Sequence, residues 1–493
     1  MQTVNIDILF FKVFRDVYLE SLIKNQLYGV KCNKKIHVKS IKDAEANYQY
    51  LLKVPSFIQI VLEIDNSGDE SDRYETFLKS KQRHVVNYLV LHYKITNKHN
   101  ASLLDYENDN HMLLNEINCL KVSSAIYCIN YLPRYTNISK LVLDIIDLPL
   151  EAGTIPNTVT DLTINSDYSY PLHIGVIPSS VINLSLRLFN QPLLPGQIPF
   201  GVESLRFLEF NEPIKQGDLP ESLTHLDLGY CFNRNITPNS LPSSLTHLEF
   251  KYTFNQPLAP HSLPPNLKIL NLGSSFEQKI NTHSIPKHVV KVVFGSFDQE
   301  ILTPGIIPDS VEEVIFSSFN RVIVPGTIPK STRVLKFGNY FSRPLEVDCL
   351  PPNIKLLEFG EGFNEPLKPN ILPRYLRTLI FESCLTHDLM PNVLPLFLKT
   401  LSIGLAGDIA INVLPPTLTT LILKTFKGMI HPFSLPDSLE TLKFSSSNCN
   451  FKSLENQNVI NSGLKHLSLP KSILSLNICI CIPPSGKTKV FYK

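Results

Sequence analysis

The residues best suited to chemistry in this sequence are histidines, and two of them recur at equivalent positions of a repeated segment. His225 and His247 stand in the contexts Leu-Thr-His-Leu-Asp and Leu-Thr-His-Leu-Glu. Neighbouring imidazoles suit a metal ion, but a protein metal site needs at least a third ligand. No third ligand is evident in the sequence around them. We therefore expect the two rings to lie side by side without forming a metal centre.

Other motifs that carry chemistry are incomplete. His84, His92, His99 and His111 lack the spacing of metal ligands, and we expect them to be solvated or packed. Ser485–Thr488 reads Ser-Gly-Lys-Thr, but a phosphate-binding loop needs a glycine where Cys481 stands. The nine cysteines include no CxxC pair, so neither a disulfide framework nor a zinc knuckle is indicated. We expect no enzyme, no cofactor and no bound metal.

The composition excludes several classes of partner. The 493 residues include 43% hydrophobic side chains, 46 Lys and Arg, and 44 Asp and Glu. The near-zero net charge gives no broad basic field for nucleic acid. No run approaches the roughly 18 apolar residues of a membrane-spanning helix, and no secretory signal is visible. We expect an intracellular, cytoplasmic protein that binds no nucleic acid and does not insert into membranes.

A Leu-Pro or Ile-Pro mark recurs along most of the chain and defines a repeat. A fixed period of about 20 to 22 residues is typical of a solenoid, in which each unit buries its apolar face against its neighbours. The marked prolines are Pro156, Pro178, Pro199, Pro220, Pro242, Pro264, Pro286, Pro308, Pro329, Pro351, Pro373, Pro395, Pro415 and Pro436.

Each unit carries an apolar triplet at three, six and eight residues after its proline (positions +3, +6 and +8). Leu245, Leu248 and Phe250 illustrate it after Pro242. The last two alternate with polar neighbours, which is the period of a half-buried strand. We count about sixteen units from Ile117 to Leu442, with more doubtful triplets at Val86/Leu89/Leu91 and Leu464/Leu467/Leu469.

A Phe-Asn pair follows the strand in many units, as in Phe254-Asn255. We expect the phenylalanine to stack on its equivalents inside the solenoid. The asparagine is expected to bond backbone groups that the stacked coils leave unpaired. Closely spaced prolines then follow, such as Pro257 and Pro260, and they forbid a regular helix. The outer side should therefore be extended.

These residues resemble the FNIP repeat, a relative of the leucine-rich repeat. The resemblance is clearest at Leu241–Pro264 and Ile307–Pro329, and it covers roughly 133–444. Leu385-Thr386 departs from it, and the unit after Pro395 has no clear phenylalanine, so curvature should change there. The resemblance implies a leucine-rich-repeat-like, right-handed coil of parallel strands and an interaction scaffold, and little further chemistry.

The predicted architecture is a mainly β solenoid with atypical ends. We assign 1–84 to an N-terminal cap that is α or α+β, 85–132 to divergent first coils, 133–445 to FNIP-type repeats and 446–493 to a C-terminal cap and tail. Apolar residues between Phe10 and Ile23 have helical spacing. That helix either caps the first coil or resembles the start of an F-box, which would make the protein a substrate-recognition subunit of a ubiquitin ligase.

The predicted binding surface is the outward, concave side of the strands, at positions +5 and +7. Many residues there are polar, but one apolar residue appears in each of six consecutive units. Exposed β-branched residues also occur simply because they favour strands; a contiguous patch instead indicates a binding site for a protein or peptide. The six residues are Ile269, Val293, Ile315, Val334, Leu356 and Ile380.

Overall fold

The structure is a computed structural model of the chain. It describes residues 35–38, 59–65, 88–92, 119–122, 137–144, 149–165, 168, 170–295, 303–470, 480–483 and 488–492, the first three ranges as backbone only. The chain divides into two units, Met1–Leu208 and Glu209–Lys493.

The first unit is a ladder of parallel strands, each paired with the next along the chain. Its strands are β1 (Lys35–Val38), β2 (Gln59–Asp65), β3 (Tyr88–His92), β4 (Cys119–Val122), β5 (Lys140–Leu143), β6 (Asp161–Ile164), β7 (Asn183–Leu186) and β8 (Ser204–Phe207). The doubtful triplet Val86/Leu89/Leu91 therefore overlaps a strand, β3.

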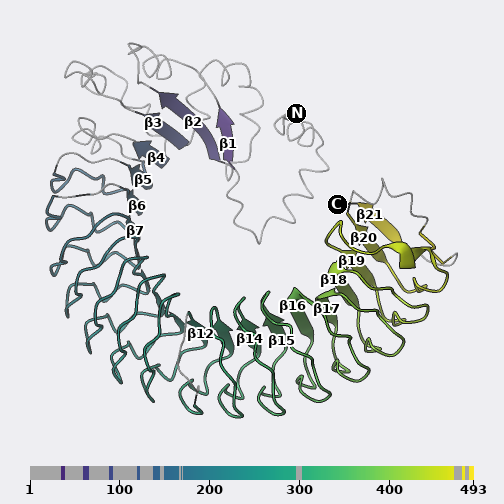
Figure 1. Ribbon diagram of the computed structural model, residues 1–493. Helices are drawn as coiled ribbons and strands as arrows, with labels where there is room; N and C mark the ends of the chain where they lie inside the picture. Colours follow the sequence, from purple (N-terminus) through teal and green to yellow (C-terminus); the bar gives the residue numbers. More distant parts are fainter. Residues whose placement is uncertain are drawn as a thin grey trace. The chain divides into compact units, whose positions relative to one another are not determined.

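The second unit repeats the arrangement, and all its neighbouring strands are parallel. Its strands are β9 (His225–Asp227), β10 (His247–Glu249), β11 (Ile269–Asn271), β12 (Lys291–Phe294), β13 (Glu313–Phe316), β14 (Val334–Phe337), β15 (Leu356–Phe359), β16 (Thr378–Leu385), β17 (Thr400–Leu405), β18 (Thr420–Phe426), β19 (Thr441–Phe444), β20 (His466–Leu469) and β21 (Lys489–Tyr492). Within this unit the strands follow the inner side of the curve and the connections the outer side (Figure 1).

The predicted solenoid of parallel coils is confirmed. Strands β4 to β19 correspond to the sixteen units counted between Ile117 and Leu442, and the second doubtful triplet overlaps β20. The only helix among the described residues is the 3-10 helix η5 (Lys452–Glu455), as the closely spaced prolines predict.

The two ends of the ladder extend into the regions assigned to caps. Strands β1 and β2 lie within residues 1–84 and pair with each other. Strand β21 lies within the expected C-terminal tail and pairs with β20. The helix expected between Phe10 and Ile23 lies outside the described residues.

Equivalent residues stack because successive coils are in register. Leu226, Leu248 and Leu270 are Cα partners along β9, β10 and β11, and each is buried. The alternation of buried and half-buried residues along the strands places positions +6 and +8 in the core. A strand whose side chains alternate between the two faces of a sheet produces this pattern directly.

Phenylalanines fill the interior as the sequence predicts. Phe254 is 1% exposed. Its ring stacks on Phe232 and on Phe276, with centroids 6.2 and 5.9 Å away. It also lies 3.8 Å from Phe250, which occupies position +8 of the same coil. Offset stacking of this kind adds to the free energy of burying such large side chains.

The asparagine of five Phe-Asn pairs accepts a hydrogen bond from a backbone N–H of the next coil. The Oδ1 atom of Asn233 accepts a hydrogen bond from the backbone N–H of Asn255, at 2.9 Å. Asn255 in turn accepts from the backbone N–H of Glu277, at 3.0 Å. Because the strands end before this point, these N–H groups have no ladder partner, and the side-chain amide supplies one. The predicted role of the asparagine is confirmed.

The strands lengthen where the sequence departs from the repeat. Leu385 and Leu405 stand in register where other coils carry phenylalanine, and β16 and β17 continue to these residues. The pairing register shifts between Ile380 and Cys384. Where leucine replaces phenylalanine in the core, the strands are thus longer and their pairing register shifts.

A left-handed turn precedes every marked proline. The residue three positions before it (position −3) has positive φ in all fourteen units, a conformation that suits glycine and, less well, asparagine and aspartate. These residues are Gly153, Gly175, Gly196, Gly217, Asn239, His261, His283, Gly305, Gly326, Asp348, Asn370, Asn392, Asn412 and Phe433. Phe433 is the bulkiest side chain in this conformation.

Candidate functional site

The six apolar residues predicted for partner binding lie on the outward side of the strands. Each is half-buried, and each alternates with buried core residues along its strand. The predicted inward and outward register of the strands is therefore confirmed. The six residues come from successive strands and are Ile269 (β11), Val293 (β12), Ile315 (β13), Val334 (β14), Leu356 (β15) and Ile380 (β16).

Four of these residues form two cross-strand apolar pairs. Val293 and Ile315 are Cα partners on β12 and β13. Val334 and Leu356 are partners on β14 and β15. Directly opposed side chains on neighbouring strands are close enough to contact. The structure therefore joins four of the six predicted residues in two pairs.

An ion pair accompanies each apolar pair on the same two strands. Lys291 Nζ lies 3.0 Å from Glu313 Oε1, beside Val293 and Ile315. Lys336 Nζ lies 2.9 Å from Glu358 Oε2, in the strands that carry the second apolar pair. The apolar pair occupies position +7 in the first case and position +5 in the second. Apolar and charged pairs thus alternate diagonally across β12–β15.

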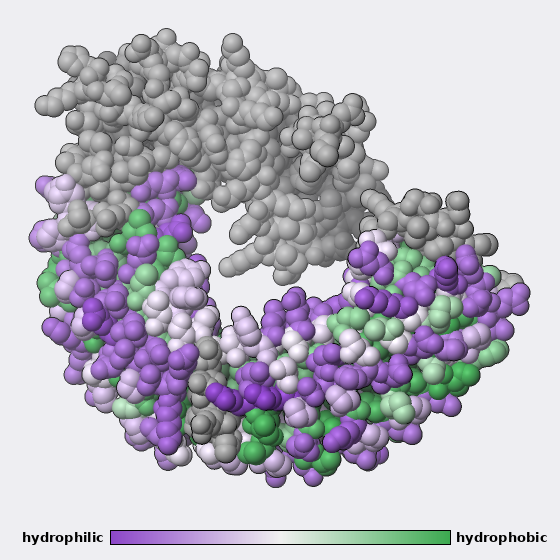
Figure 2. Space-filling model, in the orientation of Figure 1, coloured by the Kyte–Doolittle hydropathy of each residue, from purple (hydrophilic) through white to green (hydrophobic). Residues whose placement is uncertain are grey.

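The two remaining predicted residues lie at the ends of this arrangement. Ile269 is opposite Lys291, and Ile380 is opposite Glu358. Hydrophobic and hydrophilic residues are likewise mixed over the face of the second unit that Figure 2 presents. The surface is therefore amphipathic rather than one uninterrupted apolar area.

Sequence reasoning missed one further apolar residue on the same surface. Ile422 of β18 stands at position +7 and is half-buried, opposite Ser402 and Lys443. The same spacing rule identifies it after Pro415, but the predicted patch ended two units earlier, at Ile380.

The two histidines at position +5 are brought together as predicted. The rings of His225 and His247 stack with centroids 3.9 Å apart and planes inclined by 17°. Each Nδ1 lies 2.8 Å from the hydroxyl of the preceding threonine, Thr224 or Thr246. Burial, and then the charge of His225, lower the pKa of His247. The arrangement thus favours the neutral form of His247 in the folded protein.

An acidic and a basic group meet beside the histidines. Lys251 Nζ lies 3.2 Å from Asp227 Oδ2 and 3.5 Å from Glu249 Oε1. Burial opposes the charge on Lys251, but attraction to Asp227 and Glu249 outweighs it and raises the lysine pKa. Asp227 also accepts a hydrogen bond from the backbone N–H of Gly229, at 3.0 Å.

Within the described ranges, no group of three or more His, Cys, Asp or Glu side chains is arranged to hold a metal ion. The thiols there are suited to packing. Cys349 is buried, and burial raises its pKa to about 11. Burial likewise raises the pKa of Cys449. A protonated thiol is a poor nucleophile and a poor metal ligand.

Several predicted features lie outside the described residues. These include His84, His99 and His111, the side chain of His92, and Ser485–Lys487 of the Ser-Gly-Lys-Thr motif. In the part of the chain that the structure does describe, no helix is both long and apolar enough to span a membrane.

Two solved structures are similar to this chain. One is the crystal structure of CroV588, described as a novel circular LRR protein; it is 22% identical, the match covers 88% of this chain and 79% of that chain, and the TM-score is 0.48. The other is the functional domain of InlJ from Listeria monocytogenes, with 13% identity, coverage of 84% and 68%, and a TM-score of 0.23. No curated protein matches the chain.

The model of the FNIP Repeat family matches the chain many times over. The matches lie at residues 147–188, 210–253, 254–297, 297–340, 319–362, 363–406 and 408–447. Together they cover more than half of the sequence. The chain therefore belongs to the FNIP repeat family.

Proposed function

We propose that this protein is a non-catalytic scaffold that binds a protein or peptide partner on the outward face of β11–β16. The observation that carries the proposal is the presence of two half-buried, cross-strand apolar pairs, Val293–Ile315 and Val334–Leu356. Each pair lies beside an ion pair on the same two strands. Interfaces commonly combine apolar anchors with a charged surround that selects the partner.

The repeated strands suit this role because they are rigid. Each strand is paired on both sides, and its core side is packed, so the outward residues are held at fixed spacing. A preorganised surface loses little conformational entropy on binding. We expect a partner that contacts the apolar pairs and places charges against Lys291, Glu313, Lys336 and Glu358.

Affinity capture with single-residue variants tests the proposal. The tagged full-length protein is incubated with a lysate of the cells that make it, and bound proteins are identified by mass spectrometry. Ile315→Asp should lose a subset of partners that the unaltered protein retains. Val290→Asp is the matched control, since Val290 is 39% exposed and lies just before β12 rather than on its outward face. Identical partner sets for Ile315→Asp and the unaltered protein would exclude this face as the binding surface.

The alternative role as a substrate-recognition subunit of a ubiquitin ligase rests on the sequence of residues 1–60. Capture of ligase adaptor proteins by the full chain, and their loss when residues 1–60 are deleted, would favour it. If the deletion does not change the capture of any adaptor protein, residues 1–60 would be assigned the role of a cap instead.

The scaffold is proposed to act inside the cell, in the cytoplasm. Within the described residues, Cys231, Cys349, Cys384, Cys449 and Cys481 form no disulfide, which suits a reducing compartment. Fractionation of cells that express the tagged protein checks the compartment.

A further inference from the structure

A groove runs along the flank of the second unit, away from the outward face of the strands. Its floor is formed by the leucine that precedes each marked proline, and these leucines are 5–6% exposed. Two cavities of about 670 and 1040 Å³ share Asn392, Leu394 and Leu396 and thus form one continuous depression, the lateral groove. The floor leucines are Leu350, Leu372, Leu394, Leu414 and Leu435.

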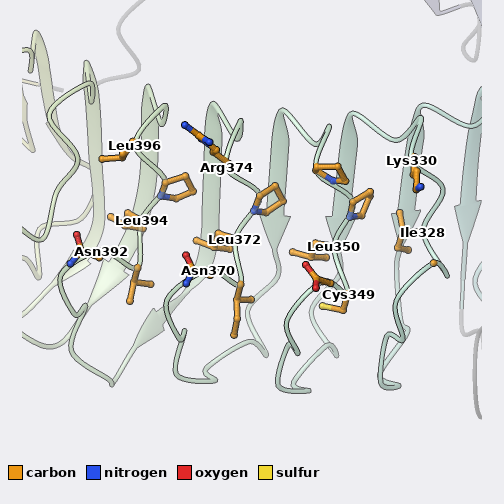
Figure 3. A pocket seen from close by; sticks show the side chains of 18 residues that line it. Ile328, Lys330, Cys349, Leu350, Asn370, Leu372, Arg374, Asn392, Leu394 and Leu396 are labelled. Atoms are coloured by element: carbon orange, nitrogen blue, oxygen red, sulfur yellow. The ribbon is translucent and has the colours of Figure 1, made fainter.

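The walls of the lateral groove come from two fixed positions of the repeat. Figure 3 shows Asn370 and Asn392, at position −3, on one side of Leu372 and Leu394, and Arg374 on the other. The left-handed turn at position −3 forms one wall, and the residue after the proline forms the opposite wall. Because each coil adds one such step, the groove crosses the coils.

Six cations stand along one side of the coils that form the first half of this groove, and two of them, Lys330 and Arg374, line the groove itself. They stand at positions +1 and +4 of four successive units, where the sequences Lys-Ser-Thr-Arg, Pro-Asn-Ile-Lys, Arg-Tyr-Leu-Arg and Leu-Phe-Leu-Lys contain no carboxylate. All six side chains are exposed. We call them the cationic flank: Lys330, Arg333, Lys355, Arg374, Arg377 and Lys399.

The cationic flank is largely unneutralised. The only ion pair that the described residues provide to it joins Arg333 Nε to Glu312 Oε2 at 3.9 Å, and both side chains are about half-exposed or more. Lys355 and Arg374 instead lie 5.3 and 5.8 Å from the ring centroid of Tyr375. Like charges on neighbouring coils repel one another. An anionic ligand bound beside them would relieve that repulsion.

The charge pattern changes sharply at both ends of the flank. The preceding unit carries Asp309 and Glu312 at positions +1 and +4, and the unit after Pro436 carries Asp437 and Glu440. The second half of the groove is lined instead by exposed apolar side chains. Leu396, Ile411 and Phe433 are 61%, 53% and 71% exposed. Asp348 also lines the first half of the groove. The side formed by positions +1 and +4 is therefore basic in the first half, and the second half is mainly apolar.

Phe433 provides a second, independent indication of a binding role. Its φ of 63° is a strained conformation for a bulky residue. The exposed ring gains little from burial in return, whereas glycine or asparagine occupies most equivalent positions without strain. Because every coil makes this turn, what distinguishes position 433 is that a large, exposed aromatic ring occupies it at the edge of the groove.

We propose that the lateral groove binds an extended peptide segment of a partner protein, acidic at one end and apolar at the other. The acidic end lies against the cationic flank, and the apolar end lies against Leu396, Ile411 and Phe433. From Ile328 to Ile460 the groove spans on the order of 30 Å at about 4.8 Å per coil, which matches about nine extended residues.

Other anionic partners fit less well. A nucleic acid is charged along its whole length and would meet Asp437 and the apolar half of the groove. A bilayer surface is flat and would not reach the recessed floor leucines. A peptide can change from acidic to apolar along its length, as the groove does.

Fluorescence anisotropy with synthetic peptides of about ten residues tests the inference. One labelled peptide carries glutamates in its first half and leucine and phenylalanine in its second half; its counterpart carries lysines in place of the glutamates. The full-length protein should bind the glutamate peptide at least about tenfold more tightly than the lysine peptide, and added salt should weaken the binding. Equal binding of the two peptides, or no binding of either, would overturn the proposal.

Paired variants locate the binding. Arg374→Glu combined with Arg377→Glu should lower the affinity for the glutamate peptide about tenfold or more. If the double variant of Arg374 and Arg377 has a lowered melting temperature, Lys355→Glu combined with Lys399→Glu repeats the test. The matched control is Lys268→Glu with Lys287→Glu, which stand at positions +4 and +1 outside the flank. A control pair that weakens binding equally would overturn the assignment to the groove.

Two further measurements separate this site from the alternatives. Phe433→Gly should weaken the binding of the glutamate peptide, and Ile315→Asp should leave it unchanged, because Ile315 lies on the outward strand face. Oligouridylate and vesicles of phosphatidylcholine and phosphatidylserine, at a ratio of about 3 to 1, are measured in parallel. Tighter binding of either than of the glutamate peptide would overturn the peptide as the occupant.

Discussion

The imidazole rings of His225 and His247 lie face to face across β9 and β10, with centroids 3.9 Å apart. The coil period places the same residue type at the same strand position in both coils. Burial of His247, followed by the nearby charge of His225, lowers the pKa of His247. The folded protein therefore favours the neutral ring at position 247.

This relationship predicts a loss of stability in acid. With the folded-state pKa below the unfolded value of about 6.5, the unfolded chain binds a proton that the folded chain resists. The stabilisation from neutral His247 is thus complete above about pH 6.5 and is lost as the pH falls through the lowered pKa. Melting temperatures at about pH 8 and about pH 5 measure the loss. The drop in melting temperature between these two pH values should be smaller in His225→Gln than in the unaltered protein. His173→Gln, at an exposed histidine outside the pair, should show the same drop as the unaltered protein. Equal drops in all three proteins would contradict the prediction.

Phe254→Ala should destabilise the protein by about 3–5 kcal/mol, the usual range for a large buried aromatic side chain. Phe254 is 1% exposed and stacks on the rings of two neighbouring coils. Because coils couple mainly to their neighbours, hydrogen exchange should accelerate first around β10 and β11 and only later in distant coils. Tyr252→Ala is the control, since Tyr252 is 59% exposed. Uniform acceleration along the chain would contradict nearest-neighbour coupling.

Ile315→Asp should leave the melting temperature nearly unchanged. The side chain is half-buried on the outward face, and its Cα partner on β14 is Lys336, which can face the new carboxylate. Val314→Asp is the matched comparison, because Val314 is fully buried one residue earlier. Thermal denaturation of both proteins measures the contrast. A loss in Ile315→Asp as large as in Val314→Asp would mean that the outward register is wrong.

Phe433→Gly should stabilise the protein by about 1 kcal/mol. The left-handed conformation costs a non-glycine residue roughly 1–2 kcal/mol, and glycine adopts it freely but gives the unfolded chain more entropy. The phenylalanine ring is 71% exposed, so little burial is lost. Chemical denaturation measures the change. Gly326→Phe is the reverse substitution at an equivalent position and should destabilise; stabilisation there, or destabilisation in Phe433→Gly, would show that the turn does not strain Phe433.

The amino-acid sequence by itself determined the repeating coil and the residues that fill its core. The period of the Leu-Pro marks, the alternation around Leu248 and Phe250, and the Phe-Asn pairs predicted parallel strands, a phenylalanine interior and asparagine bonds between coils. These features are local and repeated, and stacking in register carries each residue onto its own equivalent. The outward register of Ile269, Val293, Ile315, Val334, Leu356 and Ile380 followed from the same alternation.

The tertiary structure alone decided how residues of different coils combine. Lys291 with Glu313 and Lys336 with Glu358 lie beside two pairs that join four of the six apolar residues, because the side chain opposite each position belongs to another coil. The lateral groove likewise depends on backbone turns, which place position −3 and position +1 on opposite walls and leave Phe433 exposed. A period describes what each coil contains, whereas a surface arises from contacts between coils, and these are fixed only when the chain is folded.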